Sequence, residues 1–519
     1  MSTIGGYTQS INNVFIYDEL NTLPQNMIVK NDSIYITGYY LDTSLDYGIK
    51  TFSSLYNRQG QILNNNFYRP WGIGQFVSSW YYGKLCKTNK GYIQAGYAAD
   101  SGTGNYSLLL TTYNFESKLL NYYTYPTLSP SLSSGINAIQ TSNNEYYITG
   151  IYKLGSTGKP FLLKADSNGT KIWIKYYNSV LLDFNAGASI IEDDSGHIVI
   201  AVISETEYNP PIMHLRTNKT TILNIDTAGT LRYARLDTST IYQVGYSLQK
   251  TKDNNYISCG HKITYRDSLG GYTNQQGCII KWDSLYNKIW TKDYYHLNYN
   301  AYIVLYDIQE LADGSIIGCG YAGVGNDSVF YGICGWLIKT DREGNLIWSR
   351  AYQSYKYSNY RNKHYLYDID VLSNGDIVAV GYVSVVGGDV SQQGWMIRVD
   401  SNGCLYDSNW CGYNSIEVEP KPMVWQAQNE LRVYPNPASD IINVEVSRFK
   451  YQDLTEIKFE IYDAIGINVN GLCHSEAGGV YDGELHYHLN MNELSNGIYF
   501  IRILDKENKV IGNGKFVKE

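Results

Sequence analysis

The chain has 519 residues, a formal net charge of −8 and only 17% charged residues. No Lys/Arg run is interleaved with aromatic residues, which argues against nucleic-acid binding, and no stretch approaches the roughly 20 consecutive apolar residues of a membrane-spanning helix. The first ten residues lack the basic segment and apolar core of a signal peptide, so we expect either a cytoplasmic protein or a trimmed, mature form.

Tyrosine is unusually frequent, with 52 residues. Because tyrosine favours strands and tolerates a half-exposed surface, one interpretation places these residues on outer strands and sheet edges. The other interpretation is a tyrosine-lined surface that binds sugars.

The first predicted strand, residues 13–17, stands alone, and a repeated hairpin follows it along the chain. The hairpin consists of a short apolar strand, a turn with Asp or Asn and a Gly three residues later, and a second strand with an aromatic residue. Its clearest copies are Asp166, Gly169 and Trp173; Asp283 and Trp290; and Asp341, Gly344 and Trp348. Weaker copies keep the frame at Asp226 and Gly229, at Asp400 and Gly403, and at Asn57, and the weakest copy is at Tyr113, where Glu116 replaces the glycine.

A second apolar strand precedes each hairpin, as in Ser315-Ile316-Ile317-Gly318-Cys319-Gly320-Tyr321. An Asp/Asn/Gly turn and an alternating run come before it, so each unit offers about four strands. Seven such units predict an all-β fold, a seven-bladed β-propeller over residues 1–414. The units lie near 26–70, 80–125, 135–178, 187–236, 243–295, 303–353 and 365–412. Because an unpaired edge would stay open, we expect strand 13–17 to pair with the last blade and close the ring.

The hairpin turn has a physical reason. Asp or Asn accepts backbone N–H bonds, and Gly takes a positive φ without steric cost, while the tryptophans can cover the neighbouring blade. The spacing resembles the tryptophan-docking repeats of quinone-cofactor propellers and, loosely, the Asp-box of sialidases. We interpret both resemblances as structural and expect no cofactor, because the adjacent cysteines of a quinone dehydrogenase are absent.

Two further features belong to the propeller. Cys404 and Cys411 bracket a short segment after the last repeat, and we predict a disulfide between them, which would imply an oxidising compartment. The longest insertions, residues 205–219, 262–277 and 322–332, join the second and third strands of their units. Such loops gather at one end of a propeller, so that end is the expected binding surface.

Residues 415–430 are expected to form a linker, and a different domain begins at residue 431. Short alternating strands over 431–519 predict a small Ig-like β-sandwich. Two prolines, two residues apart at its start, favour an extended segment with the first strand at a sheet edge.

This carboxy-terminal stretch resembles the type A sorting domain of type IX secretion cargo over essentially its whole length. The residues that carry the resemblance are Tyr434, Pro435, Asn436, Pro437, Asp440, Gly497, Tyr499, Lys515 and Lys518. The resemblance implies a Bacteroidota protein that is exported through the type IX translocon. It also implies that the domain is removed and that the remainder is attached to the cell surface through lipopolysaccharide or released. The absent signal peptide departs from an intact precursor, and a trimmed amino terminus is the simplest account.

Candidates for chemistry are sparse. His486 and His488 share one strand face and could chelate a metal, although we interpret them as incidental, and the acidic stretch 192–194 occupies a repeat turn. No P-loop, GxSxG, HExxH or EF-hand pattern is present, so no catalytic, metal or cofactor residue is assigned. We expect a non-catalytic module that binds a glycan or a surface protein. The alternatives are a polysaccharide hydrolase or lyase with carboxylates on one rim, and a purely structural stalk.

Overall fold

The computed structural model describes residues 11–15, 21–42, 48–70, 73–77, 83–103, 105–127, 133–154, 157–177, 184–208, 215–236, 243–266, 272–294, 303–325, 330–354, 362–385, 392–405, 413–414, 431–446, 458–463, 469, 474–481, 484–504 and 510–519. The chain forms two compact units, Met1–Ile416 and Glu417–Glu519. Every regular element in the described part is a β-strand, so the expected all-β class is confirmed.

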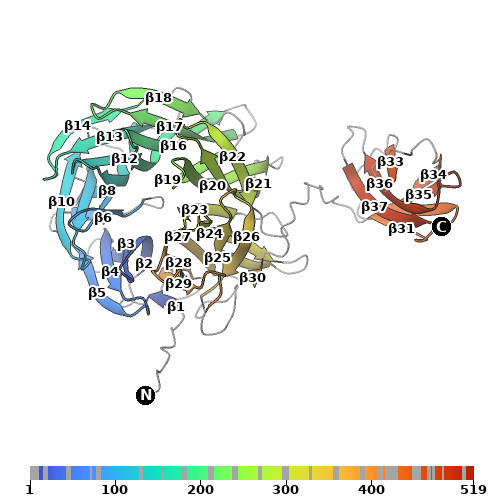
Figure 1. Cartoon of the computed structure of the whole chain (residues 1–519), viewed down its shortest axis with the longest axis horizontal. Helices are drawn as coiled ribbons and strands as arrows, with labels where there is room; N and C mark the ends of the chain where they lie inside the picture. Colours follow the sequence, from blue (N-terminus) through green and yellow to red (C-terminus); the bar gives the residue numbers. More distant parts are fainter. Residues whose placement is uncertain are drawn as a thin grey trace, which may run out of the picture. The chain divides into compact units, whose positions relative to one another are not determined.

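The first unit is a ring of seven blades (Figure 1). Blades 3 and 4 are joined into one eight-stranded sheet by a single parallel pair, Gly158 opposite Phe184. Blade 1 contains β2 (Thr22–Lys30), β3 (Ser33–Asp42), β4 (Gly48–Tyr56) and β5 (Ile62–Tyr68). Blade 2 contains β6 (Ile73–Val77), β7 (Cys86–Lys87), β8 (Tyr92–Asp100), β9 (Tyr106–Tyr113) and β10 (Leu119–Pro126). Blade 3 contains β11 (Ser134–Gln140), β12 (Tyr146–Leu154), β13 (Thr157–Ala165) and β14 (Lys171–Tyr176). Blade 4 contains β15 (Phe184–Glu192), β16 (Ile198–Tyr208), β17 (Leu215–Ile225) and β18 (Leu231–Leu236).

The remaining blades follow the same order from the channel outward. Blade 5 contains β19 (Gln243–Lys250), β20 (Tyr256–Arg266), β21 (Tyr272–Trp282) and β22 (Lys288–Tyr294). Blade 6 contains β23 (Ile303–Glu310), β24 (Ile316–Gly325), β25 (Phe330–Thr340) and β26 (Leu346–Tyr352). Blade 7 contains β27 (Lys363–Val371), β28 (Ile377–Ser384) and β29 (Gln392–Val399), and its outer strand is β1 (Ile11–Phe15).

The ring closes through its two ends. β1 pairs antiparallel with β29, from Ile11 opposite Arg398 to Phe15 opposite Gly394. This strand begins two residues before the expected 13–17, and residues 16 and 17 lie outside the described part. The chain after Gly403 therefore does not supply the outer strand of blade 7. Instead, β30 (Tyr413–Asn414) pairs with β26 in blade 6.

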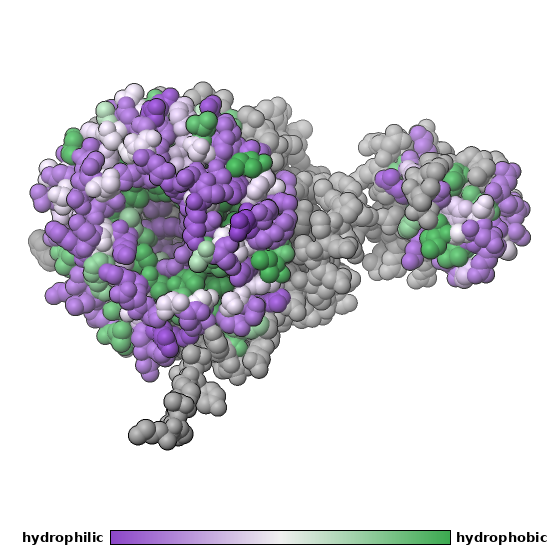
Figure 2. Space-filling view, viewed as in Figure 1, coloured by the Kyte–Doolittle hydropathy of each residue, from purple (hydrophilic) through white to green (hydrophobic). Residues whose placement is uncertain are grey.

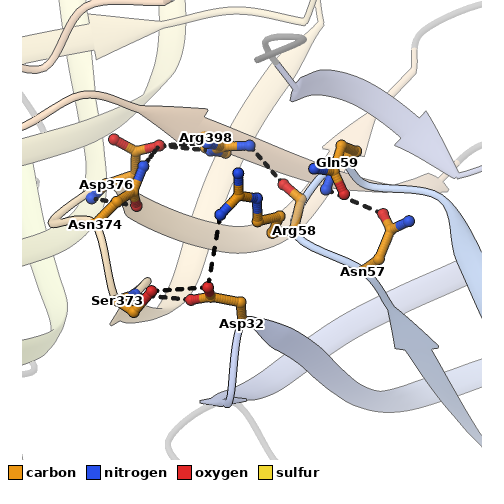
Figure 3. A network of polar contacts seen from close by, with 8 residues as sticks. All are labelled: Asp32, Asn57, Arg58, Gln59, Ser373, Asn374, Asp376 and Arg398. Carbon is orange, nitrogen blue, oxygen red and sulfur yellow. Dashed lines mark hydrogen bonds and ion pairs between the residues drawn. The ribbon is translucent and has the colours of Figure 1, made fainter. Parts of the chain in front are cut away.

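A polar network strengthens this junction between blades 7 and 1 (Figure 3). Arg398 of β29 is fully buried and donates to the Asp376 carboxylate and to the main-chain oxygen of Arg58. In the adjacent turns, Ser373 donates through its main-chain N–H, at 2.8 Å, and its hydroxyl, at 2.7 Å, to the Asp32 carboxylate. Because the Arg398–Asp376 ion pair is shielded from water, removing one partner would leave the other as an uncompensated buried charge.

The core of the propeller lies between blades. Trp336 and Trp395, both fully buried, are in equivalent third strands of blades 6 and 7. A side chain at Gly277 or Gly335 in the preceding blade would overlap the corresponding indole ring. Tryptophan therefore fills each inter-blade space against a glycine backbone, which buries a large apolar area.

The outer turns follow the predicted hydrogen-bond pattern. In blade 6, Asp341 Oδ1 accepts the main-chain N–H groups of Glu343, at 3.0 Å, and Asn345, at 2.7 Å. The first turn residues that repeat this arrangement are Asn57, Asn114, Asp166, Asp283 and Asp400. The frame expected from Tyr113 and Glu116 is wrong by one residue, because Asn114 supplies the oxygen and Ser117 takes the positive φ of 67°.

The predicted insertions are not simple loops. Residues 205–208 and 215–219 extend the hairpin of β16 and β17, and their register continues to Tyr208 opposite Leu215. The hairpins of β20 with β21 and of β24 with β25 are lengthened in the same way. By continuing the β-ladder, these polar segments form hydrogen bonds with their own backbone N–H and C=O groups.

The second unit has two sheets. One has the order β31 (Leu431–Tyr434), β32 (Ile441–Val446), β35 (Glu484–Asn490), β34 (His474–Tyr481), and the other has the order β33 (Lys458–Asp463), β36 (Gly497–Leu504), β37 (Val510–Lys518). Residues of both sheets, including Ile442, Val444, Ile501 and Phe516, share one buried apolar cluster. The unit is therefore a small β-sandwich, with β31 at a sheet edge.

Candidate functional site

A belt of polar residues runs around the inner strands of the propeller. In six blades the innermost strand carries a β-bulge, and a polar residue follows it: Asn26, Asn137, Ser189, Ser247, Asp307 and Asp368. Several of these side chains contact the next blade. Asp368 accepts the N–H of Met27 at 2.7 Å, for example, and Ser189 accepts the N–H of Leu248 at 3.1 Å. A β-bulge changes the direction in which a side chain points. Here the polar side chains that follow the bulges bond to the neighbouring blade.

Two carboxylates and one amine meet in this belt. Asp307 of blade 6 accepts from the ammonium of Lys84 and, at 3.0 Å, from Ser247. Burial and the negative charge of Asp307 raise the pKa of Asp368 well above its usual range. Burial acts to lower the pKa of Lys84, but the charges of Asp307 and Asp368 outweigh that effect and raise it. We call these three residues the Lys84 bridge.

Seven aromatic side chains form a continuous cluster across blades 5, 6 and 7. They are Tyr246 and His261 of blade 5, Tyr306 and Tyr321 of blade 6, and Tyr365, Tyr367 and Tyr382 of blade 7. Tyr306 contacts a ring in each adjacent blade, with centroid distances of 5.5 Å to Tyr246 and 4.7 Å to Tyr367. A residue that touches both neighbours lies toward the axis of the ring. We call this set the aromatic cluster.

Repeated positions build the cluster. Tyr246, Tyr306 and Tyr367 are the extra residues of three inner bulges. The other members include the residue that follows the glycine of the second strand in blades 5, 6 and 7, namely His261, Tyr321 and Tyr382. In β23 and β24, Val304 lies opposite Tyr321, near the end where β24 leads into the predicted insertion. The cluster therefore lies toward the end of the propeller that carries these extended hairpins.

The inner surface of the ring contains apolar residues and aromatic residues that are partly exposed. Figure 2 shows a hollow at the centre of the first unit, with hydrophobic residues on its wall and hydrophilic residues over much of the outer surface. Tyr306, Tyr321, Tyr365 and Tyr382 are half-buried rather than fully buried. On blades 3 and 4, the apolar residues Ile136, Ile151, Ala186, Ala188 and Ile203 occupy neighbouring inner positions. Aromatic rings with exposed parts and polar tips suit an amphipathic ligand.

The cluster has one titratable end. The hydroxyl of Tyr246 lies 3.1 Å from Nδ1 of His261, and burial lowers the pKa of His261 to about 4. The imidazole is therefore neutral at pH 7 and can both donate and accept a hydrogen bond. Among the described residues, no group of three or more His, Cys, Asp or Glu is arranged to hold a metal ion.

The repeat residues named from the sequence lie elsewhere. Asp166, Asp226, Asp283, Asp341 and Asp400 are in outer turns, where their oxygens are bonded to main-chain N–H groups. Trp173 approaches Gly229, Trp290 approaches Gly344, and Trp348 donates to the main-chain oxygen of Ser401 at 3.1 Å. Each of these contacts joins one blade to the next.

Sequence reasoning missed the Lys84 bridge and the aromatic cluster. The available signal for the cluster was the recurring Gly-Tyr or Gly-His pair of the second strand, at positions 320, 381 and 260. Cys404 takes part in a disulfide. Cys411 lies outside the described residues, so the pairing of these two cysteines remains a prediction.

The sorting-motif residues of the second unit come together although they are distant in the chain. Asn436 donates to the main-chain oxygen of Lys515 at 3.2 Å and accepts from Val517 N–H at 2.9 Å. Tyr499 stacks on Phe516 with a centroid distance of 5.5 Å. The remaining contacts are the pairing of Gly497 with Lys518, the bridge of Ala438 to Lys518, the bond from Met491 N–H to the Asp440 oxygen, and the cis peptide bonds before Pro435 and Pro437.

The architecture defines a class: a β-propeller protein that carries a separate carboxy-terminal β-sandwich. Residues 432–519 match the family of secretion system C-terminal sorting domains. The chain is thus a type IX secretion cargo, destined for the cell surface or the extracellular medium. In the described part of the chain, no helix has the length and hydrophobicity to cross a membrane.

Comparisons with other proteins add little on activity. No curated protein sequence matches the chain. Similar solved structures include an ulvan lyase from a new family of polysaccharide lyase, with 10% identity over 76% of this chain and 96% of that chain and a TM-score of 0.46. Others are a protein of unknown function from Dyadobacter fermentans (10% identity, 75% and 98% coverage, TM-score 0.41) and the propeller domain of the Trilobed protease from Pyrococcus furiosus (10%, 72% and 93%, TM-score 0.39). At TM-scores below 0.5, these similarities support no inference about activity.

Proposed function

We propose that the exported propeller is a glycan-binding module and that the aromatic cluster is its binding surface. The observation that supports this proposal is the continuous contact of seven aromatic rings across three blades, three of them on the bulges of innermost strands. Aromatic rings offer rigid apolar faces for the C–H surfaces of sugar rings, and their hydroxyls meet sugar hydroxyls. Because the chain is secreted or displayed at the cell surface, polysaccharides are accessible ligands.

The environment of the two carboxylates in the polar belt favours a binding function over hydrolysis of a glycan. Asp368 already accepts the N–H of Met27 at one oxygen and the N–H of Ile369, at 3.0 Å, at the other. Asp307 is engaged by Lys84 and Ser247. A general acid or base has to reach the scissile bond of the substrate, whereas these two carboxyl groups are 96% or more buried and hold blades together.

A polysaccharide hydrolase or lyase is the second candidate. Its supporting observation is the raised pKa of Asp368 beside Asp307, because one protonated and one ionised carboxyl group can act as acid and base in glycoside cleavage. This candidate requires the pair to become accessible to a bound saccharide.

One assay separates these candidates. The full chain is titrated with a panel of polysaccharides, and soluble products are measured in the same wells. We expect saturable binding without products, and we expect Tyr306→Ala to weaken it at least about tenfold, or roughly 1.4 kcal/mol. The matched control is Tyr122→Ala, which truncates a 42% exposed tyrosine on outer strand β10. Product release would favour the enzyme, and equal loss in both variants would place the binding surface elsewhere.

A further inference from the structure

Blade 2 departs from the other blades at its inner strand. β6 pairs with the end of β8, where Val77 lies opposite Tyr97, and β7 pairs with its start, where Cys86 lies opposite Ile93. The pairing of β8 with β7 therefore ends at Ile93, and its pairing with β6 begins at Tyr97. At this position the innermost strand of each of the other six blades carries a single bulge residue, whereas in blade 2 two separate strands, β6 and β7, pair with β8.

The segment directly before β7, Gly83–Lys84–Leu85, contacts other blades. Asn26 of blade 1 donates to the main-chain oxygen of Gly83. Lys84 bonds to Asp307 of blade 6, which is separated from blade 2 by blades 1 and 7. Leu85 is 7% exposed and packs into the tyrosine cluster between blades 1 and 2. The Lys84 bridge therefore crosses the central channel and is fixed at both of its ends.

The bridge lies directly next to the aromatic cluster. Asp307 and Asp368 follow Tyr306 and Tyr367 in the chain, so the bridge is one residue nearer to the opposite end of the ring. The Asp307 side chain is 3% exposed, whereas that of Lys84 is 25% exposed. Lys84 is thus the more exposed member of this ion pair, and its ammonium carries three N–H groups, one of which bonds to Asp307.

We infer that the aromatic cluster is the wall of a blind site that takes the end of a glycan chain, with the Lys84 ammonium at its floor. This inference rests on the proposed function. A channel crossed at mid-height cannot thread a polymer, so a saccharide enters by its terminus. The ammonium then donates to a hydroxyl or carboxylate oxygen of the terminal sugar, while the sugar rings above it contact the tyrosines.

The number of protein molecules bound per polysaccharide chain tests the inference without any amino-acid substitution. A linear polysaccharide that binds in the panel is cut into fractions of increasing length, and stoichiometry is measured by calorimetry and analytical ultracentrifugation. We expect one protein per chain at every length. A number that rises with chain length would show binding along the polymer and overturn the blind site, while the glycan-binding function would stand. Binding to no polysaccharide would overturn both.

A pair of variants tests the floor. Replacing both partners, Lys84→Met with Asp307→Asn, removes the ammonium and also the carboxylate that bonds to it, so Asp307 is not left as a buried unpaired charge. We expect about a tenfold weaker affinity for a short oligosaccharide and an unchanged circular dichroism spectrum. The control is Lys262→Met with Asp293→Asn, which removes an ion pair of 2.7 Å within blade 5. Equal affinity in the two double variants would exclude Lys84 from the site.

Discussion

The hydroxyl of Tyr177 donates a hydrogen bond of 3.0 Å to the main-chain oxygen of Gly229 and so joins the outer strand of blade 3 to the outer turn of blade 4. Equivalent bonds join Tyr68 to Ser117, Tyr125 to Gly169, Tyr294 to Gly344 and Tyr352 to Gly403. Because each tyrosine lies eleven residues after the first residue of its own turn, one repeated residue links neighbouring blades five times.

Removing one of these hydroxyls should destabilise the propeller. Tyr177→Phe leaves the Gly229 oxygen without this donor in a buried site, and we expect a loss of about 1–2 kcal/mol in the free energy of unfolding. Urea denaturation of the full chain measures the loss. Tyr122→Phe, on an exposed tyrosine of β10, is the control, and a loss as small as in this control would contradict a stabilising role for the bond.

Ring closure by β1 should contribute to thermal stability. Deleting residues 1–20 exposes the edge of β29, which otherwise pairs with β1 from Ile11 to Phe15. We expect the melting temperature in a calorimetric scan to fall by several degrees. An unchanged melting curve would show that blade 7 does not need its fourth strand.

The free energy of unfolding should depend on both partners of the buried ion pair at the same junction. Arg398→Met leaves the carboxylate of Asp376 buried, because that side chain is 3% exposed, and we expect a loss of about 3–5 kcal/mol. Arg58→Met is the control, since its side chain is 43% exposed and its 3.8 Å pair with Asp32 is a surface contact, for which we expect at most about 1 kcal/mol. Adding Asp376→Leu to Arg398→Met should recover much of the loss, and no recovery would argue against the charge explanation.

Stability should fall in mild acid through two buried histidines. Burial lowers the pKa of His261 and of His364 from 6.5 to about 4, so the fold favours the neutral ring. Their contribution is complete above pH 6.5 and is lost as pH falls from 6.5 towards 4, with a slope of about 1.4 kcal/mol per pH unit for each histidine.

Urea denaturation between pH 7.5 and 4.5 checks this slope. Asp368 and Asp370 have raised pKa values, so their contributions increase on acidification and partly offset the loss. The comparison of wild type with the double variant His261→Gln and His364→Gln isolates the histidines. A variant with the same pH slope as wild type would show that other groups control it.

In the sorting domain, Asn436 should couple the two ends of the motif. Asn436→Ala removes its bonds to Lys515 and Val517, and we expect the free energy of unfolding of this unit to fall by about 1–2 kcal/mol. Export from a host with the type IX system should fall in parallel. Asn492→Ala is the control, because residue 492 donates to Asn490 through its main-chain N–H, which alanine keeps. Normal export of Asn436→Ala would separate the motif from sorting.

The sequence by itself determined the architecture, because repetition makes each local signal count many times. The Asp/Asn turn, the glycine three residues later and the aromatic residue of the outer strand recur at a nearly constant interval, and each is satisfied within its own hairpin or by the next one. The sorting domain was recognisable for a related reason, since its motif residues are contiguous short segments. The exception is the turn that begins at Asn114, where Ser117 stands in the place of the glycine. The first residue of this turn could be identified only from its hydrogen bonds in the structure.

Only the tertiary structure decided what faces the channel. Lys84 and Asp307 are more than two hundred residues apart, and no local pattern relates the segment before β7 to a carboxylate in blade 6. Tyr306 and Tyr367 meet because bulges turn both toward the axis, and a bulge depends on strand register rather than on residue type. The residues that build the ring repeat and can be found by their spacing, whereas those that form the site meet across the ring once it has closed.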